Sequence, residues 1–428
     1  MSAHIAPYLL LFLAPISSLS CFLINSQKSS FWIFVTTLLA MLFLVSSLSL
    51  DMIGFDTIKN NSDLGIISIA TEYHFDFLSI FFLAIALLTR LVMEISDHHN
   101  LKKTFGNNFR FFCGVSLLGI FALVGIFSTN NIFNLFIFIE IYCLTFCAVT
   151  AMSDDLFLSK LAGKYFCNSA LSSIVLLASL VWIYFVSGQF EIDKISALVA
   201  NQNHDLIFAL IIGAICLKFL PIQNYFEQLK SADLLAGFAC GHAFIINGLV
   251  GFYLLLKISL FIFHPSQIFS ILSTGAGFLL VFYGNYKTLK AKHLRLIAAY
   301  FALINLGFVL ITIGFFGKQA LDTSLMYIAS YSLSGLVTFG LASLVRKDFP
   351  SCYFKNVCSF GEISVRKKLI MAGVIALVFS SPIALTFWAN WHLAILAFDF
   401  HIGALSLIPI ITTILMTVYL LIGGFYKG

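Results

Sequence analysis

Apolar runs of about 20 residues alternate with short polar connections along the whole chain. A helix of about 20 apolar residues crosses the ~30 Å hydrocarbon core of a bilayer. Continuous runs without period-two alternation exclude a membrane β-barrel. The pattern therefore predicts an all-α, polytopic helical membrane protein with about thirteen transmembrane helices, near residues 7–24, 31–50, 75–95, 111–128, 131–151, 165–186, 206–225, 234–256, 267–284, 295–316, 324–345, 369–389 and 403–425. An alternative assigns Trp388–Phe400 to part of another segment.

The composition supports this class and excludes several others. Of the 428 residues, 60% are hydrophobic and 10% are charged, with a mean hydropathy of +1.01, whereas a soluble domain carries about 25% charge. The nine cysteines lie mostly inside apolar runs, without metal-ligand spacing, and are interpreted as small hydrophobic residues. We find no Gly-rich phosphate loop and no nucleic-acid-binding stretch. Tyr8–Ile24 lacks a basic n-region and a cleavage site, and is expected to be a retained helix.

The basic residues are distributed unequally between the two sets of connections. The connections at 51–74, 129–130, 187–205, 257–266, 317–323 and 390–402 lie on one side and carry 4 Lys or Arg residues, and the other side carries 18. Arg90 and Lys218 lie within predicted helices and complete the 24. Because Lys and Arg concentrate in cytoplasmic loops, we expect the N-terminus outside and the C-terminus in the cytoplasm.

Four of the charged residues inside or at the ends of the predicted helices are candidates for a function: Asp76, Arg90, Glu140 and Lys218. A charge near the bilayer centre costs about 2.5–3.5 kcal/mol on insertion scales, so such residues pair, reach water or have a function. Glu140 lies near the middle of its predicted span, where a carboxyl group can hold or release a proton as a cation approaches or withdraws. Lys218 lies deep in its span, just before Pro221, which can break the helix and open a hydrated cavity.

Each of these residues also has a purely structural interpretation. Glu140 could simply be hydrogen-bonded to a neighbouring helix, and Lys218 could extend to the membrane surface. Asp76 stands at a helix start, where a carboxylate suits the helix dipole, and Arg90 could reach the inner surface. His242 is equally compatible with a proton relay and with an interhelical hydrogen bond.

The order of several segments resembles a known family. "YHFDFLSIFFLAIALLTRLV", "NLFIFIEIYCLTFCAV", "GKYFCNSALSSIVLLASLVWIYFVSG" and "LKAKHLRLIAAYFALINLGFVLITIG" resemble the third, fifth, sixth and tenth helices of the antiporter-like subunits of respiratory complex I and of Mrp-type cation/proton antiporters. The resemblance runs from about Asp76 to Ala397 and places Glu140 on the family's key glutamate. It implies a multi-pass protein of the bacterial inner membrane that works with other membrane subunits.

The resemblance also implies a domain organisation. Residues 1–74 would form N-terminal helices and an outward loop, 75–397 the antiporter-like core, and 398–428 a C-terminal helix and tail. Two inverted five-helix repeats, at about 111–256 and 267–425, would each contain a broken helix, with breaks at Pro221 and Pro382.

The sequence departs from the family pattern at several places. The helix-7 lysine of the family falls on Cys216, and Lys218 lies two residues later, about 200° around a helix. Asn247 and Asn390 stand where the family has titratable residues in its eighth and twelfth helices. Because asparagine does not take up a proton at ordinary pH, the second half of a proton pathway is incomplete in this sequence.

Three functional hypotheses follow. The leading one is a component of a multisubunit Na+/proton antiporter, similar to the D-type subunit of Mrp antiporters, that conducts protons near Glu140, Lys218, His242, Asn247 and Asn390. Its alternative is a proton-pumping membrane subunit of NADH:quinone oxidoreductase, a transporter subunit rather than a self-contained enzyme. A structural or assembly subunit without transport is the third. No cofactor or metal site is expected, because the sequence contains no flavin, haem or iron–sulfur ligation pattern.

Overall fold

A computed structural model describes most of the chain, with gaps: residues 6–52, 58–62, 71–153, 156–199, 205–219, 245–259, 267–290, 294–315, 317–345, 385–399, 407–416 and 418. The chain divides into two compact units. The first unit consists of Met1–Leu220 and Tyr253–His264, and the second consists of Pro221–Phe252 and Pro265–Gly428. Each unit is described by itself below.

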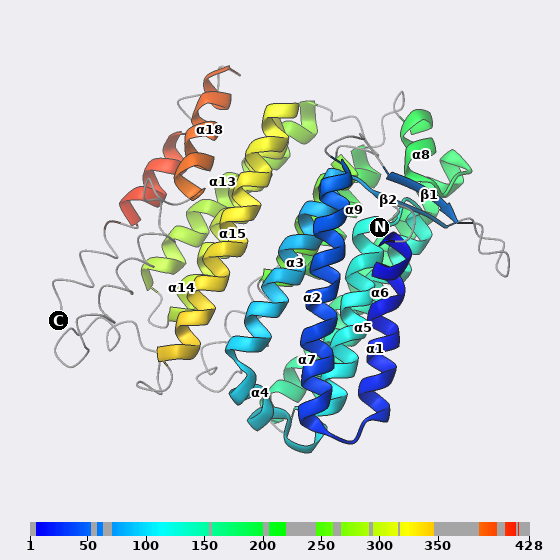
Figure 1. The fold of residues 1–428 in the computed structure, drawn as a ribbon. Coiled ribbons are helices and arrows are strands. Elements are labelled where there is room, and N and C mark those ends of the chain that lie inside the picture. The colour runs from blue at the N-terminus through cyan, green and yellow to red at the C-terminus, as the bar shows by residue number, and fades with distance from the viewer. Residues whose placement is uncertain are drawn as a thin grey trace, which may run out of the picture. The chain divides into compact units, whose positions relative to one another are not determined.

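The described part of the first unit is a bundle of long apolar helices (Figure 1). In chain order its helices are α1 (Ala6–Leu23), α2 (Gln27–Met52), α3 (Phe77–Ser96), α4 (His98–Phe105), α5 (Phe109–Ser128), α6 (Ile132–Ala151), α7 (Leu156–Ser187), α8 (Ile192–Val199) and α9 (Asp205–Phe219). Helix α5 packs against α1 and α6, and α7 packs against α6 and α9. Nearly every residue of α5 is buried, which makes α5 the centre of this bundle.

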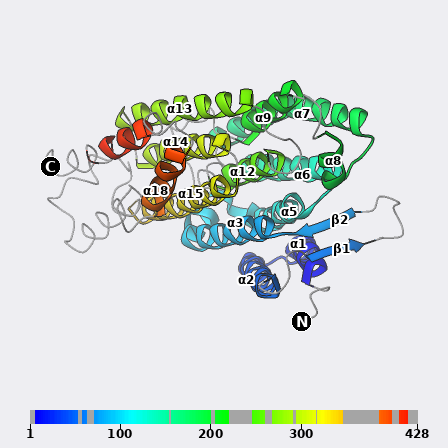
Figure 2. The same cartoon turned by 90° about the horizontal axis from the view of Figure 1, so that it is seen from above.

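Two short strands lie beside the ends of these helices (Figure 2). Strands β1 (Ile58–Ser62) and β2 (Thr71–Phe75) pair antiparallel, with Ile58 opposite Phe75. Isolated bridges link Tyr73 to Thr129 and Asn131 to Glu191. The segments before α3, α6 and α8 are therefore joined laterally by backbone hydrogen bonds, which satisfy polar groups that the helix ends leave without partners.

The second unit contains a further set of helices. They are α12 (Asn247–Lys257, in this unit through Phe252), α13 (Gln267–Lys290), α14 (Leu294–Phe315), α15 (Lys318–Val345) and α18 (Leu385–Asp399), and residues 407–416 are also helical. Helices α13 and α14 approach closely at Gly277 and Gly307, where an added methyl group would lie 2.5 or 2.7 Å from the opposite carbonyl oxygen. Small residues allow this close approach, as is common between membrane helices.

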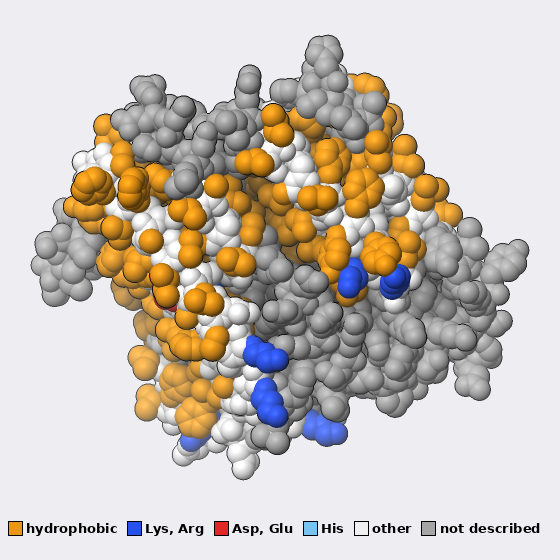
Figure 3. Space-filling model, turned by 180° about the vertical axis from the view of Figure 1, so that it is seen from behind, with side chains coloured by type: hydrophobic (Ala, Val, Ile, Leu, Met, Phe, Trp, Pro, Cys, Tyr) orange, Lys and Arg blue, Asp and Glu red, His pale blue; other side chains and the backbone are white. Residues whose placement is uncertain are grey.

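The fold confirms the prediction of a polytopic helical membrane protein. Six helical stretches among the described residues are long and apolar enough to cross a membrane, at Ala6–Leu23, Gln27–Leu50, Phe77–Ser96, Leu101–Ser128, Ile132–Ala151 and Ala162–Ser187. Hydrophobic side chains cover much of the described surface (Figure 3), as expected for a protein surrounded by lipid or by other membrane subunits. The count of thirteen crossings and the inverted repeats stay predictions.

Several predicted boundaries are wrong. Most of the connection predicted at 317–323 falls within α15, which begins at Lys318. We expected a helix to end at residue 389 and a connection to follow at 390–402, but α18 runs without interruption through Leu385–Asp399, as in the alternative assignment of Trp388–Phe400. The polar residue Asn390 lies inside this helix. In the structure the helix accommodates it, because Tyr327 donates a hydrogen bond to its side-chain oxygen.

Candidate functional site

Glu140 and Lys218 form an ion pair inside the first unit. The Lys218 Nζ atom lies 2.6 Å from Glu140 Oε1 and donates a hydrogen bond to it. The Lys218 side chain is completely buried, whereas 31% of the Glu140 side chain is exposed. Glu140 lies in the middle of α6 and Lys218 in the last turn of α9. The two residues are 78 positions apart in the sequence, and the packing of their helices brings the charges together.

Ser173 of α7 completes this site. Its hydroxyl group donates to Glu140 Oε1 at 2.7 Å or to the Ser169 carbonyl oxygen at 2.8 Å. Lys218 also donates to the Ser173 oxygen. Because a hydroxyl group has only one proton to donate, Ser173 can make only one of these two hydrogen bonds at a time. The three side chains thus form a small hydrogen-bonded network.

The surroundings of the pair are apolar and aromatic. Tyr142 and Phe219 are fully buried, with ring centroids 6.3 Å apart, one or two residues from the charged partners. Tyr165 of α7 donates to the buried Cys143 thiol at 3.6 Å and packs edge-on against Phe146. Apolar walls of this kind strengthen the attraction between opposite charges, because little water screens them.

The structure brings two of the predicted site residues together and describes two others in the second unit. The two-residue displacement of Lys218 from the family position does not prevent contact with Glu140. In the second unit, Asn247 is buried at the start of α12, and Asn390 accepts a 2.6 Å hydrogen bond from Tyr327. Three further predicted residues, His242, Pro221 and Pro382, lie outside the described residues.

Asp76 and Arg90 have structural partners. Asp76 caps α3 by accepting a hydrogen bond from the Ser79 backbone N–H at 2.7 Å, as its position at a helix start predicts. Arg90 does not extend to the membrane surface. It is buried, and its Nη2 lies 3.1 Å from Glu94 Oε1, one helical turn away. The guanidinium group is therefore paired with a carboxylate inside the protein and does not reach water.

Three polar residues near these charges were not identified from the sequence. Glu94 lies at the edge of a predicted span, Ser173 is one of several serines in its helix, and Lys257 was counted among the lysines of a surface connection. Lys257 is in fact buried, with contacts to Thr129 and Tyr253. The spacing Arg90-x-x-x-Glu94 was a usable signal, since residues four apart face each other on a helix. Within the described part of the chain, no group of three or more His, Cys, Asp or Glu residues could hold a metal ion.

A family model matches residues 129–417, which include Glu140, Ser173 and Lys218. Its description is "NADH:quinone oxidoreductase/Mrp antiporter, TM". The chain belongs to this family. The resemblance found in the sequence motifs is therefore confirmed at the level of the family that complex I and Mrp antiporters share.

Curated relatives within the NADH:quinone oxidoreductase/Mrp antiporter family are distant. NADH-quinone oxidoreductase subunit N of Alkalilimnicola ehrlichii is 24% identical over 72% of this chain and 64% of its own length. Subunit N of Rickettsia conorii is also 24% identical, over 72% of this chain and 68% of its own length. Subunit M of Buchnera aphidicola subsp. Acyrthosiphon pisum is 25% identical over 64% of this chain and 56% of its own length. The match thus spans less than two thirds of some of these relatives.

Two solved structures share the fold. A chain of the Mrp complex from Dietzia sp. DQ12-45-1b aligns over 100% of this chain and 81% of its own length, with a TM-score of 0.79 and 16% identity. A chain of the membrane-bound sulfane sulfur reductase, an archaeal respiratory membrane complex, aligns over 100% of this chain and 88% of its own length, with a TM-score of 0.81 and 16% identity. This chain is therefore a multi-pass membrane protein with the fold of the family.

Proposed function

We propose that this chain conducts protons as an antiporter-like subunit of a hetero-oligomeric membrane complex, and that Glu140, Ser173 and Lys218 carry one step of that conduction. The observation that carries the proposal is the 2.6 Å contact between Lys218 and Glu140. Opposite charges in apolar surroundings stabilise each other's charged form. A movement that separates them therefore favours protonation of the carboxylate or loss of a proton from the ammonium group.

The exposure of the two side chains suggests the order of events. Lys218 has no exposed side-chain surface, whereas part of Glu140 is exposed. A proton arriving from outside this chain reaches the Glu140 carboxylate first. Ser173, bonded to both partners, can relay this proton once Lys218 has lost one of its own. The Ser173 oxygen then accepts the proton from the carboxyl group while the Ser173 proton passes to the neutral amine, so that no net charge stays on the hydroxyl group.

Proton flux through the assembled complex tests this proposal. Glu140→Gln keeps the shape and the hydrogen-bonding capacity of the side chain but cannot carry a proton, so we expect flux to fall by at least about a hundredfold with assembly unchanged. Lys218→Met is expected to have the same effect. Glu191→Gln is the matched control, because Glu191 forms a pair with Lys194 whose lysine is more than half exposed. Unchanged flux in Glu140→Gln would leave a scaffold role as the better account.

The kind of complex has two candidates. The curated relatives described above are subunits N and M of NADH-quinone oxidoreductase, which supports a redox-driven proton pump in a bacterial inner membrane. The segments "NSALSS" and "SGQFEIDKISAL" and the likeness to a chain of an Mrp complex over 100% of this chain support a cation/proton antiporter. Both kinds of complex require the same proton step. They differ only in the source of energy that drives it.

A structural role without transport is the remaining alternative. It is favoured by the second unit, where Asn390 and Tyr327 form a neutral hydrogen-bonded pair. Neither group changes its charge at ordinary pH. The orientation with the N-terminus outside and the C-terminus in the cytoplasm belongs to the same proposal and is supported by the unequal distribution of Lys and Arg.

A further inference from the structure

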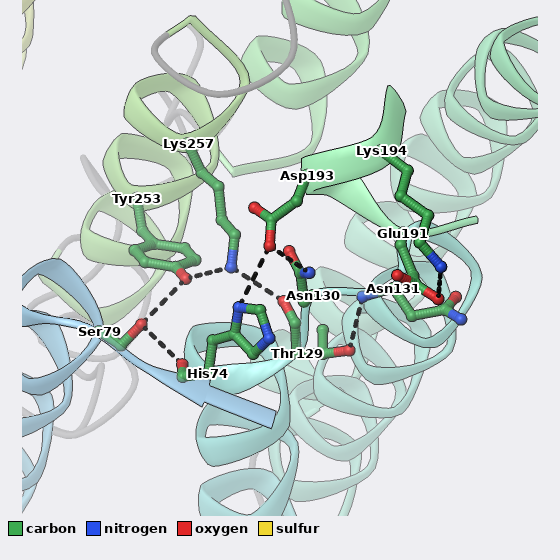
Figure 4. Close-up of polar contacts among 10 residues, drawn as sticks. All are labelled: His74, Ser79, Thr129, Asn130, Asn131, Glu191, Asp193, Lys194, Tyr253 and Lys257. Carbon is green, nitrogen blue, oxygen red and sulfur yellow. Dashed lines mark hydrogen bonds and ion pairs between the residues drawn. The ribbon is translucent and has the colours of Figure 1, made fainter. Parts of the chain in front are cut away.

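A second group of polar side chains lies at one end of the first unit, where α3 and α6 begin and α12 ends (Figure 4). We call it the helix-end cluster. It consists of His74, Asp76, Ser79, Thr129, Asn130, Asp193, Tyr253 and Lys257. The sequence predicts this end to be the outer one, because the connections at 51–74, 129–130, 187–205 and 257–266 are poor in Lys and Arg.

Lys257 is the centre of the helix-end cluster. It is 5% exposed, and its ammonium group donates to the Thr129 carbonyl oxygen at 2.9 Å and to the Tyr253 hydroxyl oxygen at 2.8 Å. Figure 4 shows the amine between these two acceptors. An ammonium group has three N–H bonds and a neutral amine has two. Lys257 can therefore lose one proton and keep both hydrogen bonds.

Tyr253 connects Lys257 to α3 and α5. Its hydroxyl group donates to the Phe127 carbonyl oxygen at 2.7 Å and lies 3.4 Å from the Ser79 hydroxyl oxygen. The Ser79 hydroxyl oxygen in turn lies 3.4 Å from the His74 carbonyl oxygen. These contacts fix the position of the Tyr253 oxygen, so that it accepts from Lys257 whatever the charge of the amine.

Two carboxylates act on Lys257 from different elements. Asp76 caps α3, and Asp193 lies in the first turn of α8, where it accepts a hydrogen bond from the Asn130 side chain at 3.0 Å. The His74 Nδ1 atom lies 3.7 Å from Asp193 Oδ2, with 14% and 49% of the two side chains exposed. These two partly exposed side chains connect the interior of the helix-end cluster to the surface.

Burial and nearby charges have opposite effects on the pKa of Lys257. Lys257 follows directly after the predicted span 234–256. Burial lowers the pKa of Lys257 to about 8, although Asp76 and Asp193 act to raise it. Both the ammonium form and the amine are therefore populated at mildly alkaline pH.

We propose that the helix-end cluster is a proton-exchange site, in which Lys257 releases protons to the solution at its own end of the protein and takes them up again, with Asp193 and His74 as its entrance. This inference rests on the proposed proton conduction. In the exchange, one N–H bond of the ammonium group breaks, the proton passes to water beside Asp193 or His74, and the electron pair stays on nitrogen. The reverse step restores the ammonium group.

The helix-end cluster and the Glu140–Lys218 pair are separate sites. Glu140 lies nine residues beyond the α6 cap Asn131, which corresponds to about 13 Å along a helix. A proton therefore does not pass directly between them. Asn134 lies between them along α6, and its buried amide nitrogen has no hydrogen-bond partner among the described residues. A group that carries a proton between the two sites could accept a hydrogen bond from this nitrogen.

The dependence of proton flux on the pH at the cluster's end tests the inference in reconstituted complex. Wild type is expected to show a break near pH 8. Asp193→Asn removes a charge that stabilises the ammonium group, so the break should move to lower pH by on the order of half a unit. Lys257→Arg keeps the charge but cannot release a proton, and flux should fall at least about tenfold. The control Lys194→Gln, at an exposed neighbouring lysine, should leave the profile unchanged.

A second measurement requires no variant. Competitive acetylation of the wild-type complex with acetic anhydride, read by mass spectrometry, should give a Lys257 reactivity that rises through about pH 8. A Lys257 that is unreactive at every pH, or an Asp193→Asn profile that coincides with wild type, overturns the inference. If Glu140→Gln abolishes flux while these results are negative, the inference alone fails. If Glu140→Gln retains flux, the proposed function fails, and the acetylation still reports on Lys257.

Discussion

Three buried charges were described above in the first unit. Each of them lies beside a group of opposite charge or beside oxygen acceptors. Lys218 has Glu140, Arg90 has Glu94, and Lys257 has two oxygen acceptors. A single charge at this depth costs several kcal/mol, and a nearby partner recovers part of that cost. Glu140 was recognisable from the sequence because it is isolated in its apolar run. Its partner Ser173 was not, since nothing in the local pattern distinguishes it from the other serines of α7.

The Arg90–Glu94 pair provides a test at this scale. Both side chains are almost completely buried, at 3% and 1% exposure. Arg90→Met leaves the Glu94 carboxylate without its nearest cation, and we expect a loss of about 3–5 kcal/mol in the free energy of unfolding. The double variant Arg90→Met/Glu94→Leu removes both charges and should recover most of this loss. Thermal unfolding in detergent measures both. A single variant as stable as wild type, or a double variant no more stable than the single one, contradicts a stabilising pair.

The helices themselves were largely predictable, because their apolar runs have the length of a membrane crossing. The prediction 131–151 and the observed α6 at Ile132–Ala151 differ by one residue. The strands β1 and β2 were not predicted, since their pairing and the bridges from Tyr73 to Thr129 and from Asn131 to Glu191 join segments that are distant in sequence. The burial of Lys257 also depends on segments that are distant in sequence. Its position after an apolar run indicated a surface connection, but in the structure α12 packs against the segment at Thr129 and buries the lysine.

The contact between α13 and α14 provides a test at the scale of elements. A methyl group at Gly277 would lie 2.5 Å from the Gly307 carbonyl oxygen, whereas one at Gly275 would meet nothing within 4 Å. Gly277→Ala should therefore destabilise the protein by about 1–3 kcal/mol through overpacking. Gly275→Ala, in the same helix, is the control and should be neutral or slightly stabilising. Equal unfolding temperatures for the two variants in detergent would show that the helices do not meet at Gly277.

At the scale of the whole molecule, the polar contacts described in the two units are of different kinds. The first holds the Glu140–Lys218 pair and the helix-end cluster, and the contacts described around Asn390 in the second are between uncharged groups. That the second half of a proton pathway is incomplete stays a prediction, based on Asn247 and Asn390 at positions where the family has titratable residues. What the sequence could not predict is whether Lys218 faces Glu140, because a displacement of two residues turns a helix by about 200° and only packing decides the outcome.

The partners of the chain should decide between the two kinds of complex. A complex purified from native membranes through a tag on this chain should reduce quinone with NADH if it belongs to the redox-driven class that the relatives' names support. Recovery of small antiporter subunits with Na+-dependent proton flux, and without quinone reduction, would assign it to the Mrp class. We expect the first result, and Glu140→Gln should abolish proton translocation in either complex.

The most direct measurement is a double-mutant cycle of proton flux on Glu140 and Lys218. If the pair acts as one unit, Glu140→Gln, Lys218→Met and the double variant should lose flux to the same extent, because removal of either partner already disables the step. Comparable amounts of assembled complex in all three are required for the comparison. Losses that multiply in the double variant, or full flux in Glu140→Gln, would contradict the account.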